Sequence, residues 1–183
     1  MKINQKIAKL AMVLFIITMA LFFLLFYLFS TRGDITDADY FNYSAIICSF
    51  ILPPIYAGVA FYGVYGSAKK EVLSFQKALK LGFIPMFVGG LLSLASIFIF
   101  FNTTGEWAQD SLKRGLVELR YGNIDEQTML EEGDKIMAEK EIISNLEYNL
   151  FSGKNFFIYY SMILFYYLII GVLFAQLFKN KRV

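Results

Sequence analysis

The chain has 183 residues, of which 57% are hydrophobic and 18% aromatic, and its formal net charge is +2. This length predicts one domain, and a charge so close to neutral gives no support for binding nucleic acid. The sequence has no histidine and a single cysteine, Cys48, which excludes histidine-based catalytic triads, histidine zinc sites and an internal disulfide.

The first expected element is an apolar segment at residues 10–29. Twenty helical residues rise about 30 Å, which is the thickness of the hydrocarbon core of a bilayer. Lysines precede this segment, as they do in a signal peptide, but the apolar run is longer than the roughly 7–15 residues of a signal core. No A-x-A cleavage site follows it. We therefore expect a retained transmembrane helix.

Three further apolar segments are expected at about residues 45–66, 81–101 and 156–178, and none contains a charged residue. Backbone groups in lipid must find their hydrogen-bond partners within the segment, so these segments are expected to be helices and not open strands. The predicted fold class is therefore all-α. We expect one domain over residues 1–183, an integral membrane four-helix bundle.

The distribution of basic residues predicts the orientation of these spans. Ten lysines and arginines lie in the N-terminal tail, in the connection between the second and third spans, and in the C-terminal tail. The connection after the first span has one arginine and three aspartates. Because short basic segments stay in the cytoplasm, both termini are expected to be cytoplasmic.

The connection between the third and fourth spans, residues 102–155, carries a net charge of −5 and should lie outside the cytoplasm. It is predicted to form an amphipathic helical hairpin. Thr103 and Glu106 have the spacing of a capping box at the start of the first helix. The apolar stripe of the second helix includes Met129 and Met137, whose flexible side chains could adapt to a partner or fill a core. The hairpin either caps the bundle, lies in the membrane interface, or binds an envelope protein.

The adjacent prolines Pro53 and Pro54 lie within the second span. Each removes one helical hydrogen bond, which frees the carbonyls of Ser49 and Phe50 and predicts a kink. A hydroxyl at similar depth is expected to donate to these carbonyls. The candidate donors are Tyr159, Tyr160, Ser93 and Ser96, and Tyr166 and Tyr167 are expected to lie deeper, nearer Tyr56.

Small residues recur in the second and third spans, and such residues allow helices to approach closely. We therefore expect tight helix packing around them. They are Ala57, Ala60, Gly63, Gly66, Gly89, Gly90, Ser93 and Ser96.

The stretch "LSFQKALKLGFIPMFVGGLLSLASIFIFF", the acidic insert after it and the ending "GVLFAQLFKNKRV" together resemble domain-of-unknown-function family 4199. This is a family of bacterial four-span membrane proteins found mostly in Bacteroidota. The resemblance implies a bacterial inner-membrane protein and no particular activity. The matching positions are Ser74, Phe75, Ala78, Leu79, Lys80 and Gly82, with Leu79 in place of the usual phenylalanine.

Two functions follow from these features. The first is a non-enzymatic envelope scaffold or sensor, without a cofactor, that acts through residues 102–155 on an envelope partner. The alternative is a small oligomeric transporter or lipid-handling protein that uses the kinked second span. Against a transporter, no ionisable group lies within the spans to couple protons or hold a charged substrate. The candidate structural or binding residues are Pro53, Pro54, Tyr159, Tyr160, Met129 and Met137.

Overall fold

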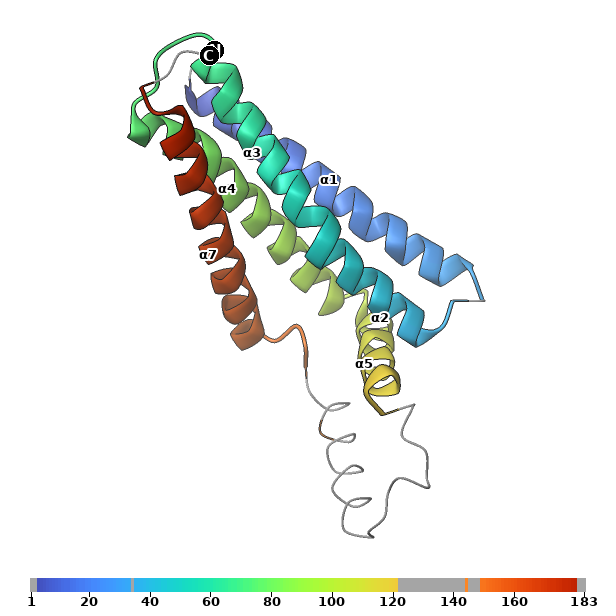
Figure 1. The fold of residues 1–183 in the computed structure, drawn as a ribbon. Helices are drawn as coiled ribbons and strands as arrows, with labels where there is room; N and C mark the ends of the chain where they lie inside the picture. Colours follow the sequence, from blue (N-terminus) through green and yellow to red (C-terminus); the bar gives the residue numbers. More distant parts are fainter. Residues whose placement is uncertain (1–2, 34, 122–143, 145–148, 181–183) are drawn as a thin grey trace.

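The computed structural model describes residues 3–33, 35–121, 144 and 149–180. In this part of the chain the regular elements are helices, and no strand is present. Met129, Met137 and the predicted second helix of the hairpin lie outside the described residues. In chain order the elements are α1 (Ile3–Thr31), α2 (Asp37–Ile46), the π-helical turn η1 (Ile47–Ile51), α3 (Leu52–Ala68), α4 (Phe75–Phe101), α5 (Glu106–Tyr121) and α7 (Gly153–Phe178) (Figure 1).

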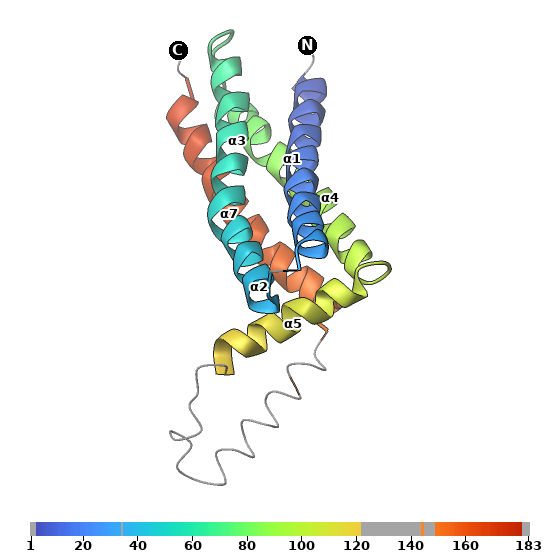
Figure 2. The same ribbon diagram turned by 90° about the vertical axis from the view of Figure 1, so that its right-hand side faces the viewer.

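Four helical stretches are long and apolar enough to cross a membrane, which confirms the predicted multi-pass helical bundle. They are α1, the continuous run α2–η1–α3, α4 and α7. Each begins before its predicted span, because polar turns at the membrane edge continue the helix. Figure 2 shows both termini and the α3–α4 connection at one end of the bundle and α5 crossing the opposite end. We call these the termini end and the α5 end.

Close contacts between helices hold the middle of the bundle and its termini end together, as the small residues predicted. A Cβ atom added at Gly63 would lie 2.7 Å from Leu10 Cδ1, so α3 and α1 are in contact there. A Cβ atom at Gly89 would lie 2.9 Å from the backbone oxygen of Ala11, which places α4 directly on the α1 backbone. Only glycine fits at these two positions without displacing its neighbours.

Backbone bonds also join the connection between α3 and α4 to the residues after α7. The side chain of Leu73 is fully buried. The backbone N–H of Asn180 donates to the Leu73 carbonyl over 2.9 Å. Ser74 accepts from the backbone N–H of Lys77 and begins α4. The termini end is therefore closed by contacts between segments that are distant in sequence.

The predicted capping box at Thr103 and Glu106 is wrong. The Thr103 hydroxyl donates to the Ile99 carbonyl over 2.8 Å, so it bonds to the end of α4 and not to the start of α5. The tight turn after α4 keeps this side chain on the helix that it follows. The capping box that does form, between Thr36 and Asp39, begins α2.

Candidate functional site: an apolar cavity under α5

The described part of the predicted hairpin, α5, closes one end of the bundle. Its residues Ala108 and Leu112 are buried in a cluster with Tyr40 of α2 and Phe101 of α4. An amphipathic helix is expected to bury the apolar residues of one side in this way. The helix α5 therefore turns its apolar side into the bundle.

A close backbone contact and an ion pair fix α5 on the first turn of α2. A Cβ atom at Gly115 would overlap the backbone of Asp37, so the two helices touch at this point. Next to it, Arg114 Nε lies 2.6 Å from Asp37 Oδ2. The Arg114 side chain is 56% exposed, so the pair adds at most about 1 kcal/mol and mainly sets the position of α5.

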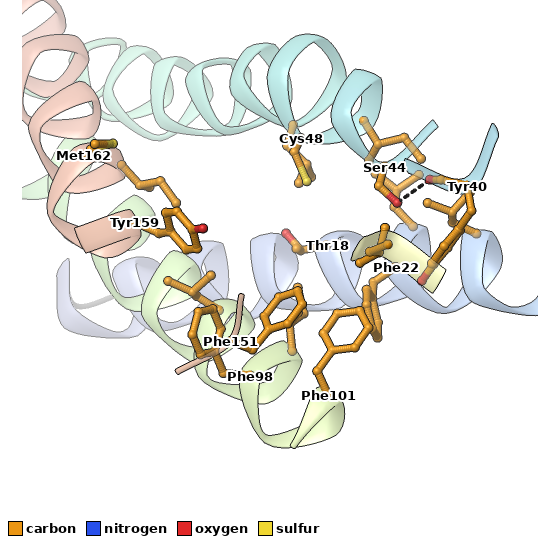
Figure 3. A pocket seen from close by; sticks show the side chains of 18 residues that line it. Thr18, Phe22, Tyr40, Ser44, Cys48, Phe98, Phe101, Phe151, Tyr159 and Met162 are labelled. Carbon is orange, nitrogen blue, oxygen red and sulfur yellow. Dashed lines mark hydrogen bonds between the residues drawn. The ribbon is translucent and has the colours of Figure 1, made fainter. Parts of the chain in front are cut away.

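A cavity of about 430 Å³ lies beneath α5, between the ends of α1, α2, η1, α4 and α7 (Figure 3). Its wall consists mainly of apolar side chains from these elements, with Leu52 of α3, Leu112 of α5 and Phe151 from the segment before α7. On α1, Thr18, Leu21, Phe22 and Leu25 recur at helical spacing along the cavity. Leu94, Phe98 and Phe101 line it from α4, and Ile163 lines it from α7.

The hydroxyl groups of Thr18 and Ser44 in the wall already have hydrogen-bond partners. The Thr18 hydroxyl lies 2.9 Å from both the Leu14 carbonyl and the Tyr56 hydroxyl. The Ser44 hydroxyl donates to the Tyr40 carbonyl over 2.8 Å, as the dashed line in Figure 3 marks. Because these groups already have partners, the cavity presents an apolar surface to whatever occupies it.

Two stacked tyrosines lie next to the cavity residue Thr18. Tyr56 is buried, bonds to the Thr18 hydroxyl and stacks on Tyr167, with ring centroids 5.0 Å apart and planes 6° apart. Gly90 makes room for the Tyr167 ring, because a Cβ atom there would lie 2.8 Å from Tyr167 Cε2. The predicted proximity of Tyr167 and Tyr56 is thus confirmed.

The cavity opens sideways between η1 and α7. Three residues in its wall are exposed: Cys48 on η1, and Tyr159 and Met162 on α7. Met162 is 67% exposed and Tyr159 is 38% exposed. Both helices belong to the set that can cross a membrane, so this opening faces the side of the bundle where lipid would lie. We call it the lateral mouth.

Where the sequence predicts a proline kink, the structure has a π-helical turn, which lies at this mouth. The Leu52 N–H donates to the Ile47 carbonyl, five residues earlier, where an α-helix would bond four residues earlier. Pro53 and Pro54 follow directly and begin α3, where their missing N–H groups are tolerated. The π turn thus accommodates both prolines within a continuous span.

The predicted donors Tyr160 and Ser93 do not serve the freed carbonyls of Ser49 and Phe50. Tyr160 Oη donates to the Phe87 carbonyl over 3.2 Å and joins α7 to α4. Ser93 Oγ donates to the Gly89 carbonyl of its own helix over 2.8 Å. Each hydroxyl takes the carbonyl closest to it.

Of the two candidate tyrosines, Tyr159 lies in the wall of the cavity, whereas the hydroxyl of Tyr160 bonds to α4. Cys48 and Phe98 were missed as cavity residues, because helical spacing identifies an inward face but not an unfilled space beside it. No group of three or more metal-ligating side chains occurs in the described part of the chain.

The family described as "Protein of unknown function (DUF4199)" matches residues 9–180. This range includes all four apolar helical stretches almost completely and the whole cavity. No curated protein and no solved structure matches the chain.

Proposed function

We propose a function for this chain, which belongs to the DUF4199 family of proteins of unknown function. We propose that it is a non-enzymatic lipid-handling protein of the bacterial inner membrane. It binds one hydrocarbon chain of a membrane lipid in the cavity under α5. The observation that carries this proposal is an apolar cavity with a lateral mouth between two membrane-spanning segments. A lipid chain can enter such a site without leaving the bilayer.

The size of the cavity suits a hydrocarbon chain. Its volume of about 430 Å³ lies within the roughly 300–1,000 Å³ of small-molecule pockets. It is nearly three times the volume of an apolar cavity of about 150 Å³ that stays dry and binds benzene. The space is therefore sufficient for a stretch of lipid chain and too narrow for a whole lipid with its headgroup.

The chemistry of the wall favours the same occupant. An empty apolar space forfeits the dispersion contacts of the atoms around it. Lipid chains are the most abundant apolar groups near the lateral mouth, and their entry restores these contacts. A charged or strongly polar ligand would find few free partners beside Thr18 and Ser44, whose hydroxyls are already bonded.

A pair of variants of α4 tests this proposal. Leu94 lies in the cavity wall, whereas Leu92 is 45% exposed on the outside of the same helix. A phospholipid with a photoreactive group at the end of one acyl chain should crosslink to the inner wall of the cavity, at Leu21 and Phe98, as located by peptide mass spectrometry. Leu94→Trp should take up part of the cavity and weaken this crosslink, and Leu92→Trp should leave it unchanged. Equal crosslinking in both variants would contradict the proposal.

We place both termini in the cytoplasm, which puts the cavity in the outer leaflet. The basic residues near the termini end support this orientation. With Cys48 replaced by alanine, a cysteine at Glu118 of α5 should react with an impermeant thiol reagent in cells with a permeabilised outer membrane. A cysteine at Gln76, near the termini end, should react after lysis alone. Both positions are exposed. The reverse pattern would invert the orientation.

An envelope scaffold remains the second candidate function, and the fixed position of α5 favours it. The contacts of Gly115 and Arg114 with Asp37 hold α5 on the bundle while Leu119 stays 41% exposed. A photoreactive amino acid at Leu119 should then capture a protein, and one at Met12, which is 52% exposed on α1, should capture lipid. Capture of lipid or water alone at both positions would contradict a scaffold.

A further inference from the structure

We infer that the groove between α1 and α3 near the termini binds an anionic phospholipid. Its phosphate lies beside Lys6 and Lys9, and the upper part of one acyl chain follows the groove toward the bilayer centre. This site lies in the other leaflet from the cavity under α5, and it does not depend on the function proposed for that cavity.

The position of Lys6 shows that the groove is a built feature. Lys6 Nζ donates to the Gly63 carbonyl and to Ser67 Oγ of α3, each over 2.7 Å. An ammonium group has three N–H donors, so one donor remains for a ligand after these two bonds. The positive charge is thus held at a defined place in the wall of the groove.

Lys9 adds a second positive charge on the same side of α1. Residues three apart in a helix are neighbours on its surface, so Lys6 and Lys9 can approach one ligand together. In the described part of the chain the ion pairs are Lys77–Glu71, Lys113–Asp110 and Arg114–Asp37. None of these pairs includes either lysine of the groove. Two cations without a carboxylate partner favour an anion as the occupant.

Beyond the lysines the groove becomes hydrocarbon. Its volume is about 360 Å³, and Leu10, Val13 and Val59 line it on the side of the bilayer centre. Val13 lies one helical turn, about 6 Å, deeper than Lys9. A ligand that touches both therefore has an anionic group at one end and an apolar chain at the other, which is the chemistry of an anionic phospholipid.

Gly58 keeps the groove open. A Cβ atom added at this position would meet nothing within 4 Å, in contrast to the close contacts at Gly63 and Gly89. Gly58 lines the groove together with Tyr62, whose side chain is 67% exposed. The glycine thus leaves space for a ligand where the other two serve helix contact. A leucine at Gly58 should occupy that space without disturbing the fold.

The test is native mass spectrometry of the full chain released from nanodiscs that contain phosphatidylglycerol and phosphatidylcholine in equal amounts. The wild type should retain phosphatidylglycerol preferentially. Lys9→Gln should lower this preference ~5-fold, the factor expected for one lysine at an anionic surface. Gly58→Leu should lower the retention of both lipids. Lys6 is left unchanged because its bonds join α1 to α3.

The matched control is Lys80→Gln, which removes an exposed lysine near the same end of the bundle and outside the groove. It should leave the preference for phosphatidylglycerol unchanged. The inference is overturned if Lys80→Gln and Lys9→Gln lower the preference equally, because general surface charge would then suffice. It is also overturned if Lys9→Gln has no effect. Unchanged thermal unfolding of the variants in detergent verifies that the bundle is intact.

Discussion

The two halves of the bundle are packed in opposite ways. Toward the termini, small residues let helices touch, so that Gly63 lies against Leu10 and Gly89 against the backbone of Ala11. Toward α5, large aromatic side chains lie between the helices, and a cavity of about 430 Å³ remains among them. At Gly63 and Gly89 small residues thus let the helices touch, whereas the rings near α5 hold the helices apart.

The geometry of the rings explains why the α5 end is not filled. Phe22 and Phe100 meet edge to face with centroids 5.3 Å apart, and Phe101 stacks on Phe151 at 4.1 Å. Such pairs prefer a few fixed arrangements. A flexible aliphatic side chain can bend into a gap, but a ring held by its neighbours cannot. The same contacts that stabilise this end therefore keep the cavity open.

The strongest test of the contrast is the removal of one leucine from each half. Leu14 is fully buried, and Leu14→Ala should lower the free energy of unfolding by roughly 2–5 kcal/mol because a new cavity forms. Leu94 already faces a cavity, so Leu94→Ala should cost less than half as much. Reversible unfolding in mixed detergent measures both values. Equal losses would show that the α5 end is packed as tightly as the rest.

Two glycine variants should change stability in opposite directions. In Gly89→Ala the new methyl group meets the Ala11 backbone oxygen at 2.9 Å, which should destabilise the protein by about 1–3 kcal/mol. In Gly58→Ala the methyl group meets nothing within 4 Å, and the better helix propensity of alanine should stabilise by up to about 1 kcal/mol. The thermal unfolding midpoints of both variants provide the measurement. If both variants shift the unfolding midpoint in the same direction, the proposed difference in packing between the two positions is contradicted.

A smaller effect is expected at the boundary between the two halves. Tyr56→Phe removes the hydrogen bond to Thr18 but keeps the ring that stacks on Tyr167. An interhelical hydrogen bond in a membrane protein contributes about 0.6 kcal/mol, so a loss of that order should appear in the same unfolding assay. Tyr62→Phe, on an exposed ring, is the control and should change nothing. A much larger loss would show that the Tyr56–Thr18 bond holds more of the packing in place than one interhelical hydrogen bond does.

The four spans could be predicted from the sequence because length and hydropathy act locally. Each predicted segment lies within an observed helical stretch. The tight contacts at Gly63 and Gly89 could also be predicted, since small residues in transmembrane helices typically mark positions of close helix packing. A kink was predicted at Pro53 and Pro54, whereas the π-helical turn that the structure has directly before them was not predicted.

The cavity could not be predicted, because it depends on the relative placement of all the helical elements that line it. The sequence shows that Leu21 and Phe22 lie on an inward face, but not that their neighbours leave space beside them. The error at Tyr160 has a related cause, because its hydroxyl bonds to the Phe87 carbonyl of α4, a contact that the tertiary fold sets. The error at Thr103 is local, since its hydroxyl bonds to the carbonyl four residues earlier.

The π turn at Ile47–Ile51 also has a consequence for insertions and deletions. A turn of this kind holds one residue more than an α-helical turn needs. Loss of a single residue from it would restore α-helical pairing and keep α2 in nearly its present rotation relative to α3, because the extra residue is held within about one turn. A deletion in the α-helical part of α3 would instead rotate α2 by about 100°. It would take Tyr40 and Ser44 from the cavity wall and move Asp37 away from Arg114. In a lineage of such proteins, the π turn is therefore the place in this span where a one-codon deletion disturbs the site least.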